Sequence, residues 1–320
     1  MPKRPSEAIG LHELLQRELE DPDFPAEWDR LAEERRWATE LGNQMLVIKI
    51  GGGAAIDEAA YGRFAQDLAE LHDAGTPFLV VHGGNAEFSR LSATLGMPPR
   101  MITNDKGRVT RYTDRATIDA MLMTYCGKVN KTVVGIFQQH GINAVGLSGI
   151  DGRIATGRRK PVLRGSEDGK SKVLRDDHAG TIDEIDTGLI TLLLKNGYVP
   201  VLTPPALAIE EGRPINVDGD KLALLLARDL SANALLFFSD TPGLLADKDD
   251  ESTLIREIDA SDPSQALASA RGRMIVKVEQ ALKAVDQGVG QVIFADARIE
   301  HPVQRALAGE GTRVRIPVIR

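Results

Sequence analysis

Leu46-Val47-Ile48-Lys49-Ile50-Gly51-Gly52-Gly53 is an apolar run of strand length that ends in three glycines. A second run of this kind, Phe78-Leu79-Val80-Val81-His82-Gly83-Gly84, follows it after a helical pattern. Glycine has no Cβ, so successive glycines let the backbone approach a ligand closely and point several N–H groups at it. Lys49 adds a cationic charge two residues before the first glycines. Fixed N–H donors beside a lysine suit a phosphate that gains charge during transfer, which predicts a phosphoryl-transfer site.

Strand and helix patterns alternate outward from these two glycine runs. Alternation at these lengths predicts an α/β fold with an open, mainly parallel sheet that helices cover on both faces. The expected strands are 45–50, 77–82, 143–148, 153–158, 171–175, 198–203, 234–239 and 291–295. The expected helices are 57–74, 85–95, 114–139, 181–196, 219–230 and 273–287. A hairpin that turns through Glu167-Asp168-Gly169 fits 153–175, and a change of domain is expected near residue 180.

Composition and charge restrict the class of protein. With a formal net charge of −7 over 320 residues, the chain is not expected to bind nucleic acid in general. Cys126 is the only cysteine, which excludes an intrachain disulfide and indicates a reducing compartment; the residue itself fits helix packing. No apolar run reaches the roughly 18–20 residues of a membrane span, and residues 1–20 lack the apolar stretch of a signal peptide. A cytoplasmic enzyme without membrane contact is therefore expected.

The familiar phosphate-binding and metal-binding motifs are absent from the sequence. There is no G-x-x-x-x-G-K-S/T loop and no H-R-D followed by D-F-G, which excludes P-loop and protein-kinase sites. Ile56 stands where a dinucleotide fingerprint beginning at Gly51 would need glycine. No group of His or Cys residues has the spacing of metal ligands, so no metal site made by the protein is expected.

Five short motifs follow one another along the chain, and together they resemble the amino acid kinase superfamily in its acetylglutamate kinase branch. They are Lys49-Ile50-Gly51-Gly52, His82-Gly83-Gly84, Asn216-Val217-Asp218-Gly219-Asp220, Ser239-Asp240-Thr241-Pro242-Gly243-Leu244 and Arg273-Met274-Ile275-Val276-Lys277. The resemblance covers about residues 45–315 and implies a three-layer αβα sandwich. It assigns residues 45–180 to the acyl substrate and 181–320 to ATP, and leaves residues 1–44 as a helical extension.

The resemblance also implies a role for each matching residue. Lys49 and Lys277 would neutralise the transferring phosphoryl group, and Asp220 would hold both lysines in place. Gly51, Gly52, Gly83 and Gly84 would donate backbone N–H groups to phosphoryl oxygens, the last two also facing the acceptor. Arg111 and Asn216 would orient the α-carboxylate of the acceptor, for which the planar guanidinium is suited. The residues implied for nucleotide binding are Ser239, Asp240, Gly243, Leu244 and Met274.

The chemistry implied by the resemblance is direct transfer to a carboxylate. The nucleophile would be the side-chain carboxylate of the substrate, and the product an acyl phosphate with no covalent enzyme intermediate. Mg²⁺ would accompany ATP, held mainly by phosphates and water. A homodimer or a larger ring of dimers is expected.

A basic island interrupts this acidic chain between residues 153 and 175, where only Glu167 and Asp168 oppose the positive charges. Its basic residues are Arg153, Arg158, Arg159, Lys160, Arg164, Lys170, Lys172 and Arg175. It is either a solvated surface hairpin or a docking surface for an acidic partner.

Further stretches resemble the carrier-protein-linked branch of the family, the LysW-aminoadipate kinases. These are Gly157-Arg158-Arg159-Lys160, Thr110-Arg111-Tyr112-Thr113-Asp114-Arg115, Tyr125-Cys126-Gly127-Lys128-Val129-Asn130-Lys131, Leu202-Thr203-Pro204-Pro205-Ala206-Leu207 and Gly309-Glu310-Gly311-Thr312. In that branch a small acidic amino-group carrier protein, LysW, caps the amino group of the substrate with its C-terminal glutamate. The residues expected to dock this carrier are Arg158, Arg159, Lys160, Lys170, Lys172 and Arg175.

Several alternatives stay open at the level of sequence. The acceptor is carrier-linked α-aminoadipate or glutamate, for lysine or arginine biosynthesis, or else free N-acetylglutamate. A catalytically silent nucleotide- or amino-acid-binding regulator is the alternative of another class. Residues 1–44 are an oligomerising or regulatory helix, an unrelated accessory segment, or a region upstream of a true start at Met45. If the extension senses arginine or lysine, emission from Trp28 and Trp37 should change together with activity.

Overall fold

The computed structural model describes residues 44–317, apart from 105, 106, 108, 168, 248 and 265–272 and the side chains of 273, 274 and 276. Residues 1–43 form one unit and residues 44–320 another. The expectations for the N-terminal extension, including those for Trp28 and Trp37, therefore lie outside the described residues.

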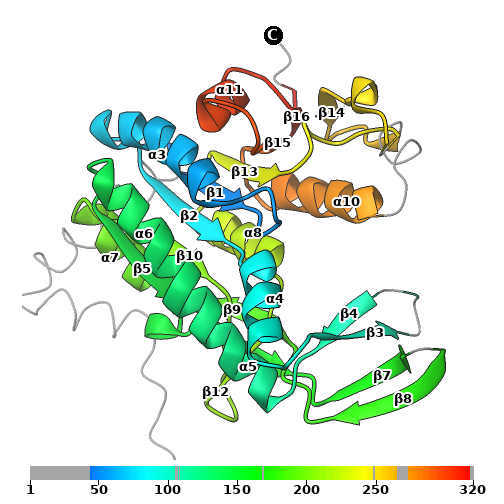
Figure 1. The fold of residues 1–320 in the computed structure, drawn as a ribbon. Coiled ribbons are helices and arrows are strands. Elements are labelled where there is room, and N and C mark those ends of the chain that lie inside the picture. Colours follow the sequence, from blue (N-terminus) through cyan, green and yellow to red (C-terminus); the bar gives the residue numbers. More distant parts are fainter. Residues whose placement is uncertain are drawn as a thin grey trace, which may run out of the picture. The chain divides into compact units, whose positions relative to one another are not determined.

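An eight-stranded sheet forms the centre of the second unit (Figure 1). Its strand order is β14-β16-β15-β13-β1-β2-β10-β5, and every neighbouring pair is parallel except β15 and β16. The strands are β1 (Leu46–Ile50), β2 (Phe78–His82), β5 (Ala144–Ser148), β10 (Val199–Thr203), β13 (Ala234–Ser239), β14 (Glu257–Asp259), β15 (Gln291–Asp296) and β16 (Thr312–Arg315). The open, mainly parallel sheet predicted from the sequence is confirmed.

Helices pack on the two faces of this sheet. One side of the sheet carries α3 (Glu58–Asp73), α6 (Asn130–Gln139) and α11 (Pro302–Leu307), which contact one another or the strands. The other side carries α8 (Gly219–Asp229) and α10 (Arg273–Asp286), which contact each other and β1, β13 or β15. α7 (Gly188–Lys195) packs on β10. Leu46, Ile48 and Ile50 of β1 belong to the buried core with Phe64 and Phe238, whose rings meet edge to face at 4.8 Å. Because side chains alternate along a strand, Lys49 points to the opposite face, on which α8 lies.

Two smaller four-stranded sheets complete the described unit. One has the order β12-β11-β6-β9 and the other β4-β3-β7-β8, which Figure 1 shows extending away from the central sheet. Their strands are β3 (Arg100–Asn104), β4 (Val109–Tyr112), β6 (Ala155–Arg159), β7 (Val162–Glu167), β8 (Lys170–Arg175), β9 (Gly180–Ile185), β11 (Ala206–Ala208) and β12 (Arg213–Ile215).

Two sequence predictions need correction in this region. The predicted hairpin is present with its turn next to Gly169, but its first strand is β7, whereas β6 belongs to the other small sheet and pairs with β9 and β11. Residues 181–185, predicted as the start of a helix, form β9, and α7 begins only at Gly188. Both errors have one cause: the pairing partner of a strand lies far away in the sequence, so local periodicity does not reveal it.

The predicted helix 114–139 contains an uncommon element. It consists of α5 (Arg115–Met121), a π-helix η1 (Leu122–Val129) and α6. In η1 the N–H of Asn130 reaches back to the carbonyl of Tyr125, five residues earlier. Such π turns are often found at functional sites.

The central sheet is continuous across the domain change expected near residue 180. β10, from beyond that position, lies between β2 and β5, and residues 44–320 cluster as one unit. The division into an acyl half and a nucleotide half therefore stays a prediction about binding. Among the described helices, none has both the length and the apolar character to cross a membrane.

Candidate active site

The two glycine loops meet at the carboxyl edge of the central sheet. β1 and β2 are parallel neighbours, so Gly51–Gly53 and Gly83–Gly84 emerge side by side. A Cβ on Gly52 would lie 2.5 Å from the backbone nitrogen of Gly84, and one on Gly83 would lie 2.9 Å from that of Gly52. A Cβ on Gly84 would lie 2.8 Å from the ring of Tyr125. The backbones are thus in direct contact, and only glycine fits at these positions.

Only some of the glycine N–H groups are available to a ligand. Gly51 N–H donates to Phe238 O at 3.0 Å, and Gly83 N–H donates to Ile50 O at 3.2 Å. This corrects the expectation that all four glycines offer donors to a phosphoryl group. Within the part of the chain that the structure describes, no acceptor is found for the N–H groups of Gly52 and Gly84.

Lys49 and Asp220 form an ion pair beneath these loops. Lys49 Nζ lies 2.6 Å from Asp220 Oδ1, and the side chains are 14% and 35% exposed. Asp220 stands in the first turn of α8, where Asp218 caps the helix by accepting from the N–H groups of Asp220 and Lys221 at 2.8 and 2.9 Å. The cap fixes the start of the helix and with it the carboxylate that meets the lysine.

A small cavity of about 110 Å³ lies on the α8–α10 side of this pair. Lys49, Asp220, Lys277 and Ser239 line it, together with Gly51, Phe237, Phe238, Gln280 and Phe294. Lys277 Nζ lies 6.0 Å from the centroid of the Phe294 ring, which itself stacks on Phe237 at 5.3 Å. The structure thus brings together the three residues predicted to be catalytic.

A larger cleft of about 670 Å³ opens on the other side of the same pair. Lys49 and Asp220 line it too, and Arg111 and Asn216, the residues predicted to bind the acceptor, lie along it. Gly52, Gly83 and Lys160 also line this cleft. Because Lys49 and Asp220 line both cavities, they stand at the junction between them.

Neighbouring residues that the sequence did not reveal hold Arg111 in the cleft. Its guanidinium carbon lies 4.4 Å from the centroid of the Phe88 ring, and Nη2 donates to Asn85 Oδ1 at 3.3 Å. Tyr125 donates to the same Asn85 oxygen at 2.6 Å. Arg111 Nε is buried and has no hydrogen-bond partner in the described ranges. The nearest sequence signal was Asn85 itself, which directly follows the second glycine loop.

Asn216 and Asp177 form a second polar group on the wall of the cleft. Asn216 Nδ2 donates to Thr113 Oγ1 at 3.0 Å, and Asp177 accepts from the N–H groups of Thr113 and Ala179 at 3.0 and 3.2 Å. Burial raises the pKa of Asp177, and these amides partly oppose that shift. Asp177 was missed because nothing in its local sequence distinguishes it from a surface loop residue.

The residues predicted to bind nucleotide fall into two groups. Ser239 lines the small cavity, and Asp240 is exposed beside it. Leu244, in contrast, is buried and its N–H donates to Thr312 Oγ1 at 2.8 Å, while Gly243 has φ 156° and packs on Leu254 and Thr312. These two residues shape the loop, and their contact with nucleotide stays a prediction. The side chain of Met274 lies outside the described residues.

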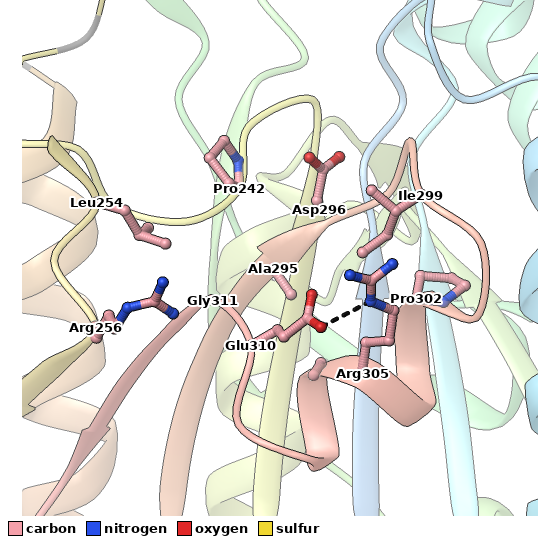
Figure 2. Close-up of a pocket in the computed structure, with 11 residues that line it drawn as sticks. Pro242, Leu254, Arg256, Ala295, Asp296, Ile299, Pro302, Arg305, Glu310 and Gly311 are labelled. Atoms are coloured by element: carbon pink, nitrogen blue, oxygen red, sulfur yellow. Dashed lines mark hydrogen bonds and ion pairs between the residues drawn. The ribbon is translucent and has the colours of Figure 1, made fainter. Parts of the chain in front are cut away.

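A third cavity of about 430 Å³ adjoins this loop at the end of β15 (Figure 2). Pro242, Leu254 and Arg256 line one side, and Figure 2 shows Arg305 and Glu310 on another, joined by a hydrogen bond of 2.8 Å. Local sequence patterns do not reveal this cavity, because it unites residues from the β13–β14 loop, β15 and α11.

The six residues of the basic island that were expected to dock the carrier separate into three parts. Arg158 pairs with Asp183 at 2.6 Å, and Arg159 pairs with Asp176 and Glu211 at 2.8 and 3.3 Å, so much of their charge is balanced within the chain. Lys160 lines the large cleft. Lys170, Lys172 and Arg175 lie exposed on β8.

Comparison with known proteins identifies the family of this chain. The model of the amino acid kinase family matches residues 44–296. The chain is 50% identical over 274 residues to LysW-aminoadipate kinase of Thermus thermophilus, covering 85% of this chain and all of that protein. It is 32% identical to acetylglutamate kinase of Methanothermobacter thermautotrophicus, covering 85% of this chain and 92% of that one.

A solved structure, N-acetylglutamate synthase of Neisseria gonorrhoeae, shares the fold. Its TM-score is 0.68 at 21% identity, over 90% of this chain and 63% of the synthase chain. This likeness concerns the fold alone. With a family match over most of its length and close relatives that are kinases, the chain belongs to the amino acid kinase family and is a phosphotransferase.

Proposed function

We propose that this enzyme transfers the γ-phosphoryl group of ATP to the side-chain carboxylate of α-aminoadipate whose amino group is linked to a small carrier protein. The product is an acyl phosphate, and the reaction is a step of lysine biosynthesis. The observation that carries the proposal is the position of Lys49 and Asp220 at the junction of the two cavities. The choice of acceptor rests on the likeness to LysW-aminoadipate kinase, which exceeds the likeness to acetylglutamate kinase.

The proposed mechanism needs only positioning and electrostatic stabilisation. ATP would place its terminal phosphate at the small cavity, and the acceptor carboxylate would approach from the large cleft, where Arg111 and Asn216 hold its α-carboxylate end. Lys49 and Lys277 would balance charge on the transferring group, and Asp220 keeps Lys49 oriented before the substrate arrives. The N–H groups of Gly52 and Gly84 would supply the remaining donors.

Mg²⁺ would reach the site with ATP. In the described ranges no three His, Cys, Asp or Glu side chains gather around a point that would suit a metal ion, and Asp220 is already paired with Lys49. Phosphate oxygens and water would therefore hold the ion, which supplies charge neutralisation when bound.

One face of the β4-β3-β7-β8 sheet suits the carrier. Cross-strand pairing places Arg111 opposite Met101, Thr103 opposite Ser166, Arg164 opposite Val173 and Val162 opposite Arg175. Because side chains alternate, all of these lie on one face, the face from which Arg111 reaches the cleft. Lys170 and Lys172 lie on the opposite face.

This Arg111 face combines exposed apolar side chains with two arginines. Met101 and Val173 are 48% and 51% exposed, and Arg164 and Arg175 are exposed beside them. Apolar area next to arginine fits a small acidic protein whose terminal residue enters the cleft. We therefore infer that Arg164 and Arg175 dock the carrier, and that Lys170 and Lys172 contribute little.

The experiment that tests the function traps the acyl phosphate with hydroxylamine while ATP consumption is followed. The acceptors are carrier protein loaded with α-aminoadipate, carrier loaded with glutamate, and free N-acetylglutamate. We expect turnover on the loaded carrier, fastest with aminoadipate. Efficient turnover on the free acid alone would make this an acetylglutamate kinase instead, and no turnover on any acceptor would favour the silent regulator.

A pair of double variants tests the docking face. Arg164→Glu with Arg175→Glu should raise KM for the loaded carrier by about ten- to a hundredfold, because like charges replace complementary ones. Lys170→Glu with Lys172→Glu carries the same change of net charge on the opposite face and should leave KM within about threefold. Equal effects of the two pairs would contradict a face-specific contact.

We also expect assembly into a homodimer or a larger ring of dimers. Light scattering on the purified enzyme measures the mass directly, and a mass of 34.7 kDa would show a monomer.

A further inference from the structure

His82 lies at the end of β2 with its ring fully buried beside the second glycine loop. Its Nδ1 donates to the carbonyl of Gly83 at 2.8 Å, since a carbonyl oxygen only accepts. Its Nε2 accepts from Asn130 Nδ2 at 3.0 Å. The two contacts require a neutral ring with the proton on Nδ1, and burial lowers the pKa of His82 to about 4. Lys49 and Lys131, the nearby charged groups, also oppose protonation.

Asn130 is itself fully engaged. Its amide donates to the carbonyl of Val201 at 3.0 Å as well as to His82, and its Oδ1 accepts from Lys131 Nζ at 3.2 Å. His82 and Asn130 are 0% and 1% exposed, so the contact between them is sealed from water, whereas Lys131 is an exposed residue. A buried and fully satisfied network fixes the ring of His82 in one orientation.

The π-helix η1 explains how Asn130 and Tyr125 both reach this loop. Residues five apart lie about 140° apart around an α-helix, so one of the two side chains would point away. The π turn closes a hydrogen bond from Asn130 to Tyr125 and brings positions five apart close to one face. Tyr125 packs on Gly84, while Asn130 holds the His82 ring that binds Gly83 O.

The peptide between Gly83 and Gly84 is therefore held from two directions. A trans peptide is planar, and its carbonyl and N–H point in opposite directions. His82 draws the Gly83 carbonyl toward the protein interior, so the Gly84 N–H points away from that interior, and no acceptor for it is found among the described residues. Gly83 also lines the large cleft.

We propose that His82 is a positioning residue for phosphoryl transfer: held by Asn130 from the π turn, it fixes the Gly83–Gly84 peptide so that the Gly84 N–H donates to the transferring phosphoryl group. The inference rests on the function proposed above. It gives His82 a role through the backbone and requires no proton exchange with the substrate.

Two variants that match each other in shape test the role. His82→Asn places an amide donor where Nδ1 lies, and His82→Leu has the same branched shape as Asn without a donor. His82→Leu should lower kcat by about ten- to a hundredfold with KM for ATP and acceptor within about threefold, because the lost contact forms fully only at the transition state. His82→Asn should keep kcat within about fivefold. Equal losses in both, no loss in either, or a change confined to KM would overturn the proposal.

A measurement on the unmodified enzyme removes the dependence on folding of the variants. Long-range ¹H–¹⁵N spectra of histidine-labelled protein should show His82 in the Nδ1–H form, unchanged between pH 8 and pH 5.5. An Nε2–H form would overturn the proposal. Because this spectrum needs no acceptor, it separates a failure of the His82 inference from a failure of the proposed reaction, which would appear as absent turnover in the unmodified enzyme.

Discussion

Gly52 and Gly53 are neighbours in one loop, yet backbone packs against the Cβ position of only the first. A Cβ at residue 52 would lie 2.5 Å from Gly84 N, whereas one at residue 53 meets nothing within 4 Å. Gly52→Ala should lower the free energy of unfolding by about 1–3 kcal/mol and remove most turnover, because the two loops must separate. Gly53→Ala should change stability by no more than about 0.5 kcal/mol and keep most activity. Chemical unfolding and steady-state kinetics on both variants measure this contrast.

Lys277 and Lys283 provide a second pair of residues on one helix. Lys277 lines the small cavity with Lys49 and Asp220, and Lys283 is an exposed residue of the last turn of α10. Lys277→Ala should lower kcat by about a hundredfold or more, since a positive charge at the transferring group is lost. Lys283→Ala should have a kcat close to that of the parent enzyme. Similar turnover in the two variants would mean that Lys277 does not stabilise the transferring phosphoryl group.

At the scale of elements, the start of α8 links stability to catalysis. Asp218 caps this helix and Asp220 stands in its first turn, so the cap sets the position of the ion pair with Lys49. Asp218→Ala should cost about 1 kcal/mol of stability and, by displacing Asp220, lower kcat about ten- to a hundredfold.

A helix start away from both cavities provides the control. Asp186 Oδ1 accepts from the N–H of Gly188 at 2.8 Å at the beginning of α7. Asp186→Ala should lower the free energy of unfolding by about as much as Asp218→Ala does and should leave kcat unchanged. If both variants lose activity in proportion to their loss of stability, the position of α8 does not determine kcat.

At the scale of the whole molecule, buried His82 makes stability depend on pH. Its pKa is about 4 in the folded protein and near 6.5 when unfolded, so the unfolded chain binds the extra proton first. The contribution of neutral His82 to the free energy of unfolding is therefore fully present above pH 6.5 and is lost as the pH falls toward 4. This contribution is about 3 kcal/mol. Denaturant unfolding of the parent and His82→Asn at pH 7, 5.5 and 4.5 should show a shallower decline in the variant. Parallel curves would contradict a buried neutral His82.

Local sequence was sufficient for six of the eight strands of the central sheet and for Lys49 with its glycines, but it did not reveal the short strands β14 and β16. Strands β1, β2, β10, β13 and β15 are short apolar runs buried on both faces, so composition alone marks them within one or two residues. Parallel order then brings the loops after β1 and β2 to one edge, which is why Lys49 and the glycines were found. The link to Lys277 and Asp220 came from the family resemblance, since no local pattern joins residues so far apart.

Tertiary structure alone decided which backbone N–H groups and which arginines are available to a ligand or partner. Pairing of β6 with β9 turned a predicted helix into a strand and removed Arg158 and Arg159 from the hairpin, because strand partners are chosen over long distances. Sheet hydrogen bonds engaged Gly51 and Gly83, whereas the N–H groups of Gly52 and Gly84 have no acceptor among the residues that the structure describes. Residue types and their order along the chain determined the chemistry and the class of fold. The register of strands and the contacts between loops determined which glycines and which arginine line the cleft, because orientation depends on packing between segments distant in sequence.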